Sequence, residues 1–135
     1  MLLLDEALQL FKALIIELHK LSGVPFDFDD QIIVADSQIE EAVYNAYVEA
    51  PYDVIYIDGG HDYENARSDI DSYRHFLRVG GWLVIDDSSN FLHMPWGSFP
   101  GIITVSKAVR DTIEKDEKFE HRLAVMHLRF WERVA

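Results

Sequence analysis

Acidic side chains follow two short apolar runs, and these are the residues of the chain best suited to chemistry. Asp58 ends the run Tyr52-Asp-Val-Ile-Tyr-Ile, and Asp86 and Asp87 end the run Trp82-Leu-Val-Ile. Such runs predict buried strands, and in an open α/β sheet ligands bind at the carboxyl ends of parallel strands. Three carboxylates gathered there repel one another unless a cation or a proton intervenes. The spacing therefore predicts a site for a hard divalent cation with oxygen ligands.

His61 lies three positions after Asp58, close enough in the chain to serve the same site. An imidazole with its ordinary pKa of about 6.5 can accept a proton at neutral pH, so His61 is a candidate general base. A surface histidine that donates to a neighbouring carboxylate fits this position equally well. His93, His121 and His127 lack a comparable context, and we expect them to be structural.

Alternating helices and short strands must position these side chains. Apolar spacing and breaker residues predict helices over residues 6–22, 39–47, 62–77 and 103–116, and strands over residues 32–35, 54–57 and 82–85. Gly80 and Gly81 are expected to stop the third helix. Residues 88–101 are predicted to form a loop, and its aromatic side chains are candidates for one wall of a substrate site. Phe119–Val134 is predicted to form one long strand or two strands joined tightly. This order predicts an α/β fold with a mostly parallel sheet.

Composition and charge narrow the function classes. The chain has 135 residues, of which 49% are hydrophobic, and this predicts a single domain over residues 1–135. The net charge is −12, and the segment from Asp27 to Asp71 holds thirteen acids against one base, Arg67. Nucleic-acid binding needs clustered basic residues, so we expect no nucleic-acid partner. A plain solubilising role is the alternative reading of the exposed acids.

The chain shows no sign of membrane insertion or secretion. No apolar run is long enough to cross a bilayer, and Met1-Leu-Leu-Leu is followed directly by Asp5 and Glu6, unlike a signal peptide. Cysteine is absent, which excludes disulfides and zinc–thiolate sites. We therefore expect no membrane partner and a cytoplasmic location.

The order strand, Asp58, helix, Gly80-Gly81, strand, Asp86-Asp87 resembles the C-terminal half of class I S-adenosylmethionine-dependent methyltransferases. The stretch from Asp53 to Glu64 is similar to that family's pattern of a strand followed by Asp-Gly-x-His-x-Tyr-Glu. The resemblance covers roughly residues 32–134. It is strongest to the small-molecule O-methyltransferases of the catechol type and of the macrolide or aminocoumarin sugar type.

This resemblance implies roles for particular residues. Asp58, Asp86 and Asp87 would hold Mg²⁺ or another divalent cation, and His61 would accept the proton of a substrate hydroxyl. Asp36 and Ser37 would contact the adenine of S-adenosylmethionine, although a turn cap is an equal alternative for this pair. Asp5 would bind the ribose, although the N-cap of the first helix is the stronger reading. The implied fold is Rossmann-like, with helices on both faces of the sheet and an antiparallel C-terminal strand.

One part of the family pattern is missing from this sequence. No G-x-G occurs, so the first strand and the Gly-rich cofactor loop have no counterpart and the fold is expected to be truncated at its N-terminus. Three functions stay open: a metal-assisted O-methyltransferase for a small hydroxylated molecule, a truncated inactive module that binds no cofactor by itself, and a phosphoacceptor receiver domain. The missing strand also predicts a homodimer, or a partner chain that completes the sheet.

Overall fold

The computed structural model describes Leu21, Gly23 and residues 35–135. The chain divides into two compact units, Met1–Val34 and Ala35–Ala135, and the description below concerns the second. Asp5 lies outside the described residues, as do the predicted helix over residues 6–22 and the predicted strand over residues 32–35, apart from Leu21 and Ala35. The single domain expected over residues 1–135 stays a prediction.

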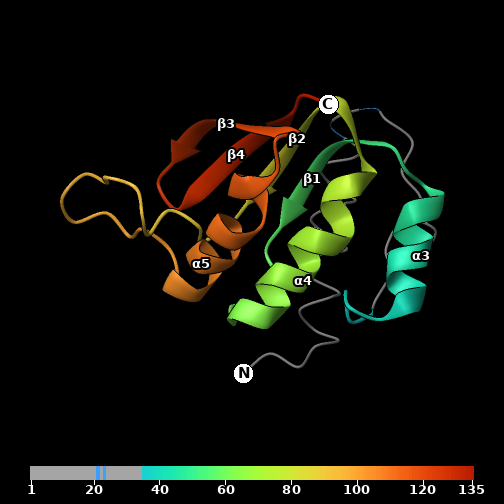
Figure 1. Cartoon of the computed structure of the whole chain (residues 1–135), viewed down its shortest axis with the longest axis horizontal. Coiled ribbons are helices and arrows are strands. Elements are labelled where there is room, and N and C mark those ends of the chain that lie inside the picture. The colour runs from blue at the N-terminus through green and yellow to red at the C-terminus, as the bar shows by residue number, and fades with distance from the viewer. Residues whose placement is uncertain (1–20, 22, 24–34) are drawn as a thin grey trace. The chain divides into compact units, whose positions relative to one another are not determined.

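Four strands of the described unit form one mixed sheet in the order β1-β2-β4-β3 (Figure 1). β1 (Tyr52–Ile57) is parallel to β2 (Leu77–Ile85), whereas β4 (Leu128–Arg133) is antiparallel to both β2 and β3 (Phe119–Val125). The predicted α/β fold with an antiparallel C-terminal strand is confirmed. Of the two readings of residues 119–134, two tightly joined strands is correct: the turn holds Met126, at a φ of 54°, and His127.

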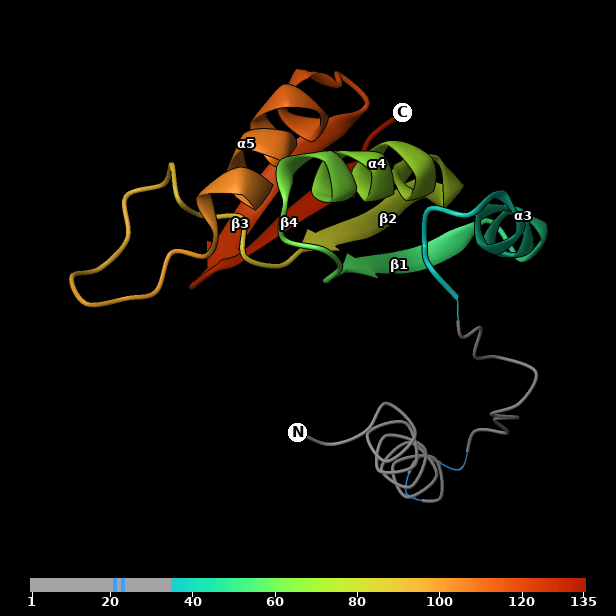
Figure 2. The same ribbon diagram turned by 90° about the horizontal axis from the view of Figure 1, so that it is seen from below.

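Helices α4 (Tyr63–Tyr73) and α5 (Ile103–Asp111) cover one face of this sheet (Figure 2). Asp62 caps α4, because its carboxylate accepts a 3.0 Å hydrogen bond from the Asn65 N–H. α3 (Glu40–Val48) opens with two glutamates, whose charge suits a helix N-terminus. Short 3₁₀ turns, η1 (Arg74–Phe76) and η2 (Ile113–Lys115), follow α4 and α5. No helix within the described residues is long and apolar enough to span a membrane.

The sequence prediction for Gly80 and Gly81 is wrong. The third helix ends at Tyr73, and β2 starts at Leu77, so the glycines lie inside the strand instead of stopping the helix. Leu77 pairs with Tyr52 and Trp82 with Val54, which leaves an irregular bulge in β2 around the glycines. Gly80 has a φ of 78°, and a Cβ on Gly81 would lie 3.0 Å from the Asp53 carbonyl oxygen. The pair is therefore needed for the bulge.

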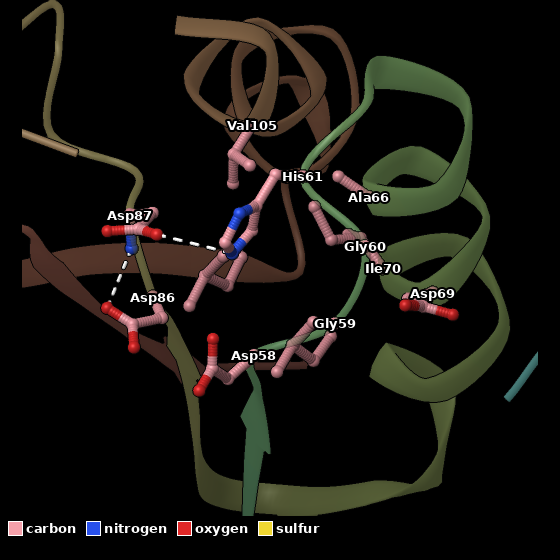
Figure 3. A pocket seen from close by; sticks show the side chains of 12 residues that line it. Asp58, Gly59, Gly60, His61, Ala66, Asp69, Ile70, Asp86, Asp87 and Val105 are labelled. Atoms are coloured by element: carbon pink, nitrogen blue, oxygen red, sulfur yellow. Dashed lines mark hydrogen bonds and ion pairs between the residues drawn. The ribbon is translucent and has the colours of Figure 1, made fainter. Parts of the chain in front are cut away.

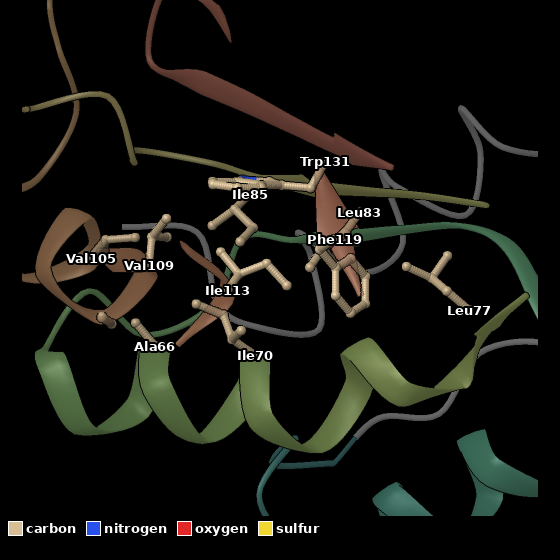
Figure 4. Packing of buried hydrophobic residues seen from close by; sticks show 11 residues of the cluster. Ala66, Ile70, Leu77, Leu83, Ile85, Val105, Val109, Ile113, Phe119 and Trp131 are labelled. Atoms are coloured by element: carbon tan, nitrogen blue, oxygen red, sulfur yellow. The ribbon is translucent and has the colours of Figure 1, made fainter. Parts of the chain in front are cut away.

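A buried apolar cluster fixes the helices to the sheet (Figure 4). Ile70 from α4 and Val109 from α5 are completely buried against Leu83 and Ile85 of β2 and Trp131 of β4. Ile55 and Ile57 of β1 pack against the same cluster. Because burial of such side chains contributes roughly 1.5–3 kcal/mol each, this cluster holds β1 and β2 in a fixed register.

Candidate active site

The carboxyl ends of β1 and β2 place Asp58 and Asp86 side by side. Ile57 pairs with Ile85, and the Asp86 N–H donates a 3.0 Å hydrogen bond to the Ile57 carbonyl, so the strands stay paired up to the acids. Asp58, Asp86, Asp87 and His61 all line one narrow cavity of about 10 Å³ (Figure 3). The structure thus brings these predicted site residues together, while their roles stay predictions.

Two hydrogen bonds orient the Asp86 carboxylate. The hydroxyl of Tyr56 on β1 donates to Oδ2 over 2.5 Å, and the Asp87 N–H donates to Oδ1 over 2.8 Å. The hydrogen bond to Asp86, burial and the nearby carboxylates raise the pKa of Tyr56. Tyr56 therefore stays protonated as a donor, and Asp86 presents Oδ1 to the other site residues.

The backbone of Asp87 is fixed by the far end of the loop 88–101. The Ile102 N–H donates a 2.8 Å hydrogen bond to the Asp87 carbonyl, and Ser88 forms a β-bridge with Gly101. Asp87 has a φ of 51°. A Cβ on Gly101 would lie 2.3 Å from the Asp87 carbonyl carbon, so only glycine allows this approach.

Two histidines flank the acidic pair. Nε2 of His61 lies 3.4 Å from Oδ2 of Asp87, and Nε2 of His127 lies 3.2 Å from Oδ1 of Asp86. His127 occupies the β3–β4 turn, and its carbonyl accepts a 2.8 Å hydrogen bond from the Ser88 N–H. Sequence reasoning did not place His127 here, although the antiparallel pairing of β2 and β4 puts the start of β4 beside the end of β2.

The donor atoms at this edge fit a divalent cation. Asp86, Asp87 and His127 each offer one ligand atom, and these atoms lie within 4.8 Å of one another. Ligands that share an ion at about 2.0–2.2 Å lie about 3–4 Å apart, so small side-chain adjustments would bring all three onto one ion. Asp58 lines the same cavity but lies outside this close group among the described residues. A metal-bound water could connect it, since Mg²⁺ keeps several waters.

A second and larger cavity, of about 260 Å³, also has Asp58 in its lining. Ser37, Tyr56, Asp69 and Tyr73 contribute to its lining. The Ser37 hydroxyl donates to Asp69 over 2.7 Å, and the Tyr73 hydroxyl donates to the Ser37 carbonyl over 2.6 Å. Asp69 is buried, and this desolvation raises its pKa. The cavity therefore offers a polar wall beside the acids.

Of the predicted cofactor residues, Ser37 borders this cavity, whereas Asp36 makes a turn cap. Oδ1 of Asp36 accepts a 2.9 Å hydrogen bond from the Gln38 N–H, as the alternative reading of the sequence has it. Of the aromatic side chains in the loop 88–101, Phe99 lies near the site. The Phe99 ring lies 5.6 Å from the His127 ring, whereas Trp96 is fully exposed.

Comparison with known proteins identifies the family. The profile of a family described as a methyltransferase domain matches residues 15–88, which is more than half of the chain. The chain belongs to this family, the class I S-adenosylmethionine-dependent methyltransferases. This membership excludes the receiver-domain hypothesis. A search of curated protein sequences finds no significant match.

Solved structures agree with this family at the level of the fold. One is the MycE methyltransferase of the mycinamycin biosynthetic pathway in complex with Mg, SAH and mycinamycin VI, at 24% identity and a TM-score of 0.52. Another, from Staphylococcus aureus, is assigned as a caffeoyl-CoA O-methyltransferase, at 17% identity and a TM-score of 0.54. The matches cover 76% and 78% of this chain, but only 31% and 53% of those chains. The chain thus spans about a third to a half of their length.

Proposed function

We propose that this chain takes part in S-adenosylmethionine-dependent methyl transfer, with metal-assisted O-methylation of a small hydroxylated molecule as its reaction. The observation that carries the proposal is the meeting of Asp58, Asp86, Asp87 and His61 at the ends of two paired parallel strands in a methyltransferase-family chain. The fold neighbours crystallised with Mg and SAH support it. An acceptor of the sugar or catechol class has the hydroxyls that such a site can hold.

In this reaction the acceptor oxygen forms a bond to the methyl carbon while the bond between that carbon and the cofactor sulfur breaks. A bound divalent cation would lower the pKa of the acceptor hydroxyl. Asp86 and Asp87 would hold that cation, with Asp58 beside them. His61 would accept the hydroxyl proton at Nδ1, because its Nε2 faces Asp87 at 3.4 Å, and the Asp87 carboxylate would stabilise the imidazolium that forms. Tyr56 keeps Asp86 oriented by its hydrogen bond.

One cavity of the described unit could hold the cofactor. The cavity beside Ser37 and Asp58 is the candidate position for the adenosyl group. The sequence lacks the G-x-G turn on which this family's cofactor loop depends, so tight binding of S-adenosylmethionine is expected to require a partner segment. An inactive module that binds no cofactor by itself is the second candidate function, and the missing glycine turn favours it.

A partner chain is part of the proposal. β1 is the last strand on its side of the described sheet, and its side chains Val54 and Tyr56 are more than half exposed. Open edges and apolar faces invite pairing, so we propose a homodimer or a partner that completes the sheet. Light scattering at tens of micromolar should give more than the monomer mass. The cytoplasmic location stays a prediction.

Calorimetric titration with S-adenosylmethionine, with and without Mg²⁺, separates the two functions, followed by a methyl-transfer assay against catechols and sugar-bearing macrolides. Binding and transfer by the chain, alone or as its oligomer, would support the enzyme. Absence of both in every assembly state would favour the inactive module. The Asp58→Ala/Asp86→Ala double variant is the matched control for metal dependence.

A further inference from the structure

We propose that the metal centre of this chain takes a nitrogen ligand from His127 beside Asp86 and Asp87, and that it therefore prefers a divalent transition-metal ion to Mg²⁺. This inference rests on the proposed metal-assisted function and specifies its cation. The side chains involved come from two distant segments, the end of β2 and the β3–β4 turn.

The polar edge of the His127 ring faces the acids. Nε2 lies 3.2 Å from Oδ1 of Asp86, and together with an oxygen of Asp87 these atoms make the close group of possible ligands. The other ring nitrogen, Nδ1, is buried without a hydrogen-bond partner among the described residues. Among residues 35–135, the polar contact that orients the ring is therefore at Nε2, on the side of the acidic pair.

The backbone around His127 is held in place independently of its side chain. The Ser88 N–H bonds to the His127 carbonyl, and Arg129, two residues on, pairs with Ile85 in the sheet. Phe99 packs against the imidazole with ring centroids 5.6 Å apart. Such a fixed ring loses little side-chain entropy on binding an ion, which suits a ligand more than a loose surface contact.

His61 is the less suitable nitrogen. Its side chain is 52% exposed and its Nε2 lies 3.4 Å from Asp87, but its nitrogen is not part of the close ligand group. The His127 side chain is 32% exposed. His61 therefore stays free to exchange protons with a substrate while His127 holds the ion.

The chemistry of the donor set decides the metal. Mg²⁺ demands oxygen ligands and keeps much of its water, so an imidazole adds little to its binding. Imidazole suits Zn²⁺ and the other first-row ions, whose affinity rises from Mn²⁺ through Co²⁺ to Cu²⁺. Two carboxylates with one imidazole should thus discriminate in favour of Mn²⁺, Co²⁺ or Zn²⁺.

Calorimetric titration of the chelator-treated full chain with Co²⁺ and with Mg²⁺, without S-adenosylmethionine, tests this. The wild-type chain should bind Co²⁺ at least about tenfold more tightly than Mg²⁺. His127→Ala should weaken Co²⁺ binding by about 10–100-fold and change Mg²⁺ binding by no more than about twofold. The visible absorption of bound Co²⁺ should change in the same variant, because a nitrogen ligand is lost.

Three further variants serve as controls for the metal-binding measurements. His127→Asp offers an oxygen in place of the nitrogen and should narrow the difference between Co²⁺ and Mg²⁺. His93→Ala, in the exposed part of the loop 88–101, should bind both metals as the wild type does. His61→Ala should also retain Co²⁺ affinity. Circular dichroism of each variant establishes that it is folded.

Unchanged Co²⁺ affinity in folded His127→Ala overturns the inference, as does a loss seen only in His61→Ala. If methyl transfer supported by Mg²⁺ persists in that case, the proposed function stands and only the ligand assignment fails. A wild-type chain that binds neither ion overturns both the inference and the metal-assisted part of the proposed function.

Discussion

The Tyr56 hydroxyl lies 2.5 Å from Oδ2 of Asp86 and joins the carboxyl end of β1 to the residue that follows β2, at the edge where the acids gather. This contact crosses two parallel strands and gives Asp86 a second donor, beside the Asp87 N–H that bonds to Oδ1. A neutral donor is suited to this place, because it satisfies one carboxylate oxygen and leaves the other for a cation or a histidine.

Tyr56→Phe should lower the free energy of unfolding by about 1 kcal/mol at neutral pH, since an exposed hydrogen bond to a charged group is lost. The pKa of Tyr56 is raised in the folded state, so its contribution is complete below the unfolded pKa of about 10 and disappears as the pH rises beyond it. Urea denaturation from neutral to alkaline pH measures both effects.

Tyr63→Phe is the matched control for the Tyr56 variant. Its hydroxyl donates over 3.1 Å to Asp111, away from the acidic pair. Only Tyr56→Phe should weaken the rise in melting temperature that a divalent cation gives by mass action. Equal metal responses in both variants would show that Tyr56 does not orient a ligand.

Gly101→Ala should lower the free energy of unfolding by about 3 kcal/mol, from a strained positive φ together with the clash at the Asp87 backbone. Gly97→Ala is the control, because Gly97 also has a positive φ, 82°, but its Cβ would meet nothing within 4 Å. That variant should lose only about 1 kcal/mol. Similar losses in thermal unfolding of both variants would contradict the close approach of Gly101 to Asp87.

Stability should fall as the pH drops below about 6.5, because the fold lowers the pKa of two surface histidines. Partial desolvation, followed by the charge of Arg129, lowers the pKa of His121, and partial desolvation, followed by the charge of Arg74, lowers the pKa of His75. A depressed histidine pKa gives stability that is present above the unfolded value and lost as the pH falls through the folded one. Nε of Arg129 donates to Nε2 of His121 over 3.3 Å, which requires that nitrogen to be unprotonated.

In His121→Gln the free energy of unfolding should therefore fall less between about pH 7 and about pH 5 than it does in the wild type. Urea denaturation across this acid limb measures the difference. His93→Gln, at an exposed loop position, should leave the limb as it is in the wild type. An unchanged limb in His121→Gln would assign the acid sensitivity to His75.

The sequence alone predicts correctly those elements that a local residue pattern determines. The apolar runs before Asp58 and Asp86 are strands, Asp62 caps a helix, and the two runs pair in parallel with the acids at one edge. Parallel pairing follows from the intervening helix, since a strand, a helix and a strand in one sheet form a crossover unit. For that reason the sequence alone predicts that Asp58 and Asp86 lie close together.

Contacts that depend on pairing between distant segments were missed. Gly80 and Gly81 fit a helix stop as well as a bulge, and only the register of β2 against β1 distinguishes them. His127 lies beside Asp86 because β4 runs antiparallel to β2, which no local pattern encodes. The sequence identifies Tyr56 only as a strand residue, because alternation gives the face of the sheet on which it lies but not its hydrogen-bond partner.

His61 is the candidate acceptor of the substrate proton. If the chain, alone or in its assembly, transfers methyl groups, His61→Ala should lower the turnover rate by roughly 10²–10⁴-fold, the usual range for a lost general base. Stability should change little, because the His61 side chain is half exposed and its contact with Asp87 is 3.4 Å long. His93→Ala should retain the wild-type rate.

The pH profile separates a base from a binding contact. The acid limb of the rate that a general base produces should be present in the wild type and absent in His61→Ala. Persistence of the limb would place the base elsewhere. Asp62, the next titratable residue, is a poor substitute because its carboxylate is occupied in capping α4 through Asn65. The remaining route would then be deprotonation of the acceptor by the bound cation itself, and the limb should shift when one metal ion replaces another.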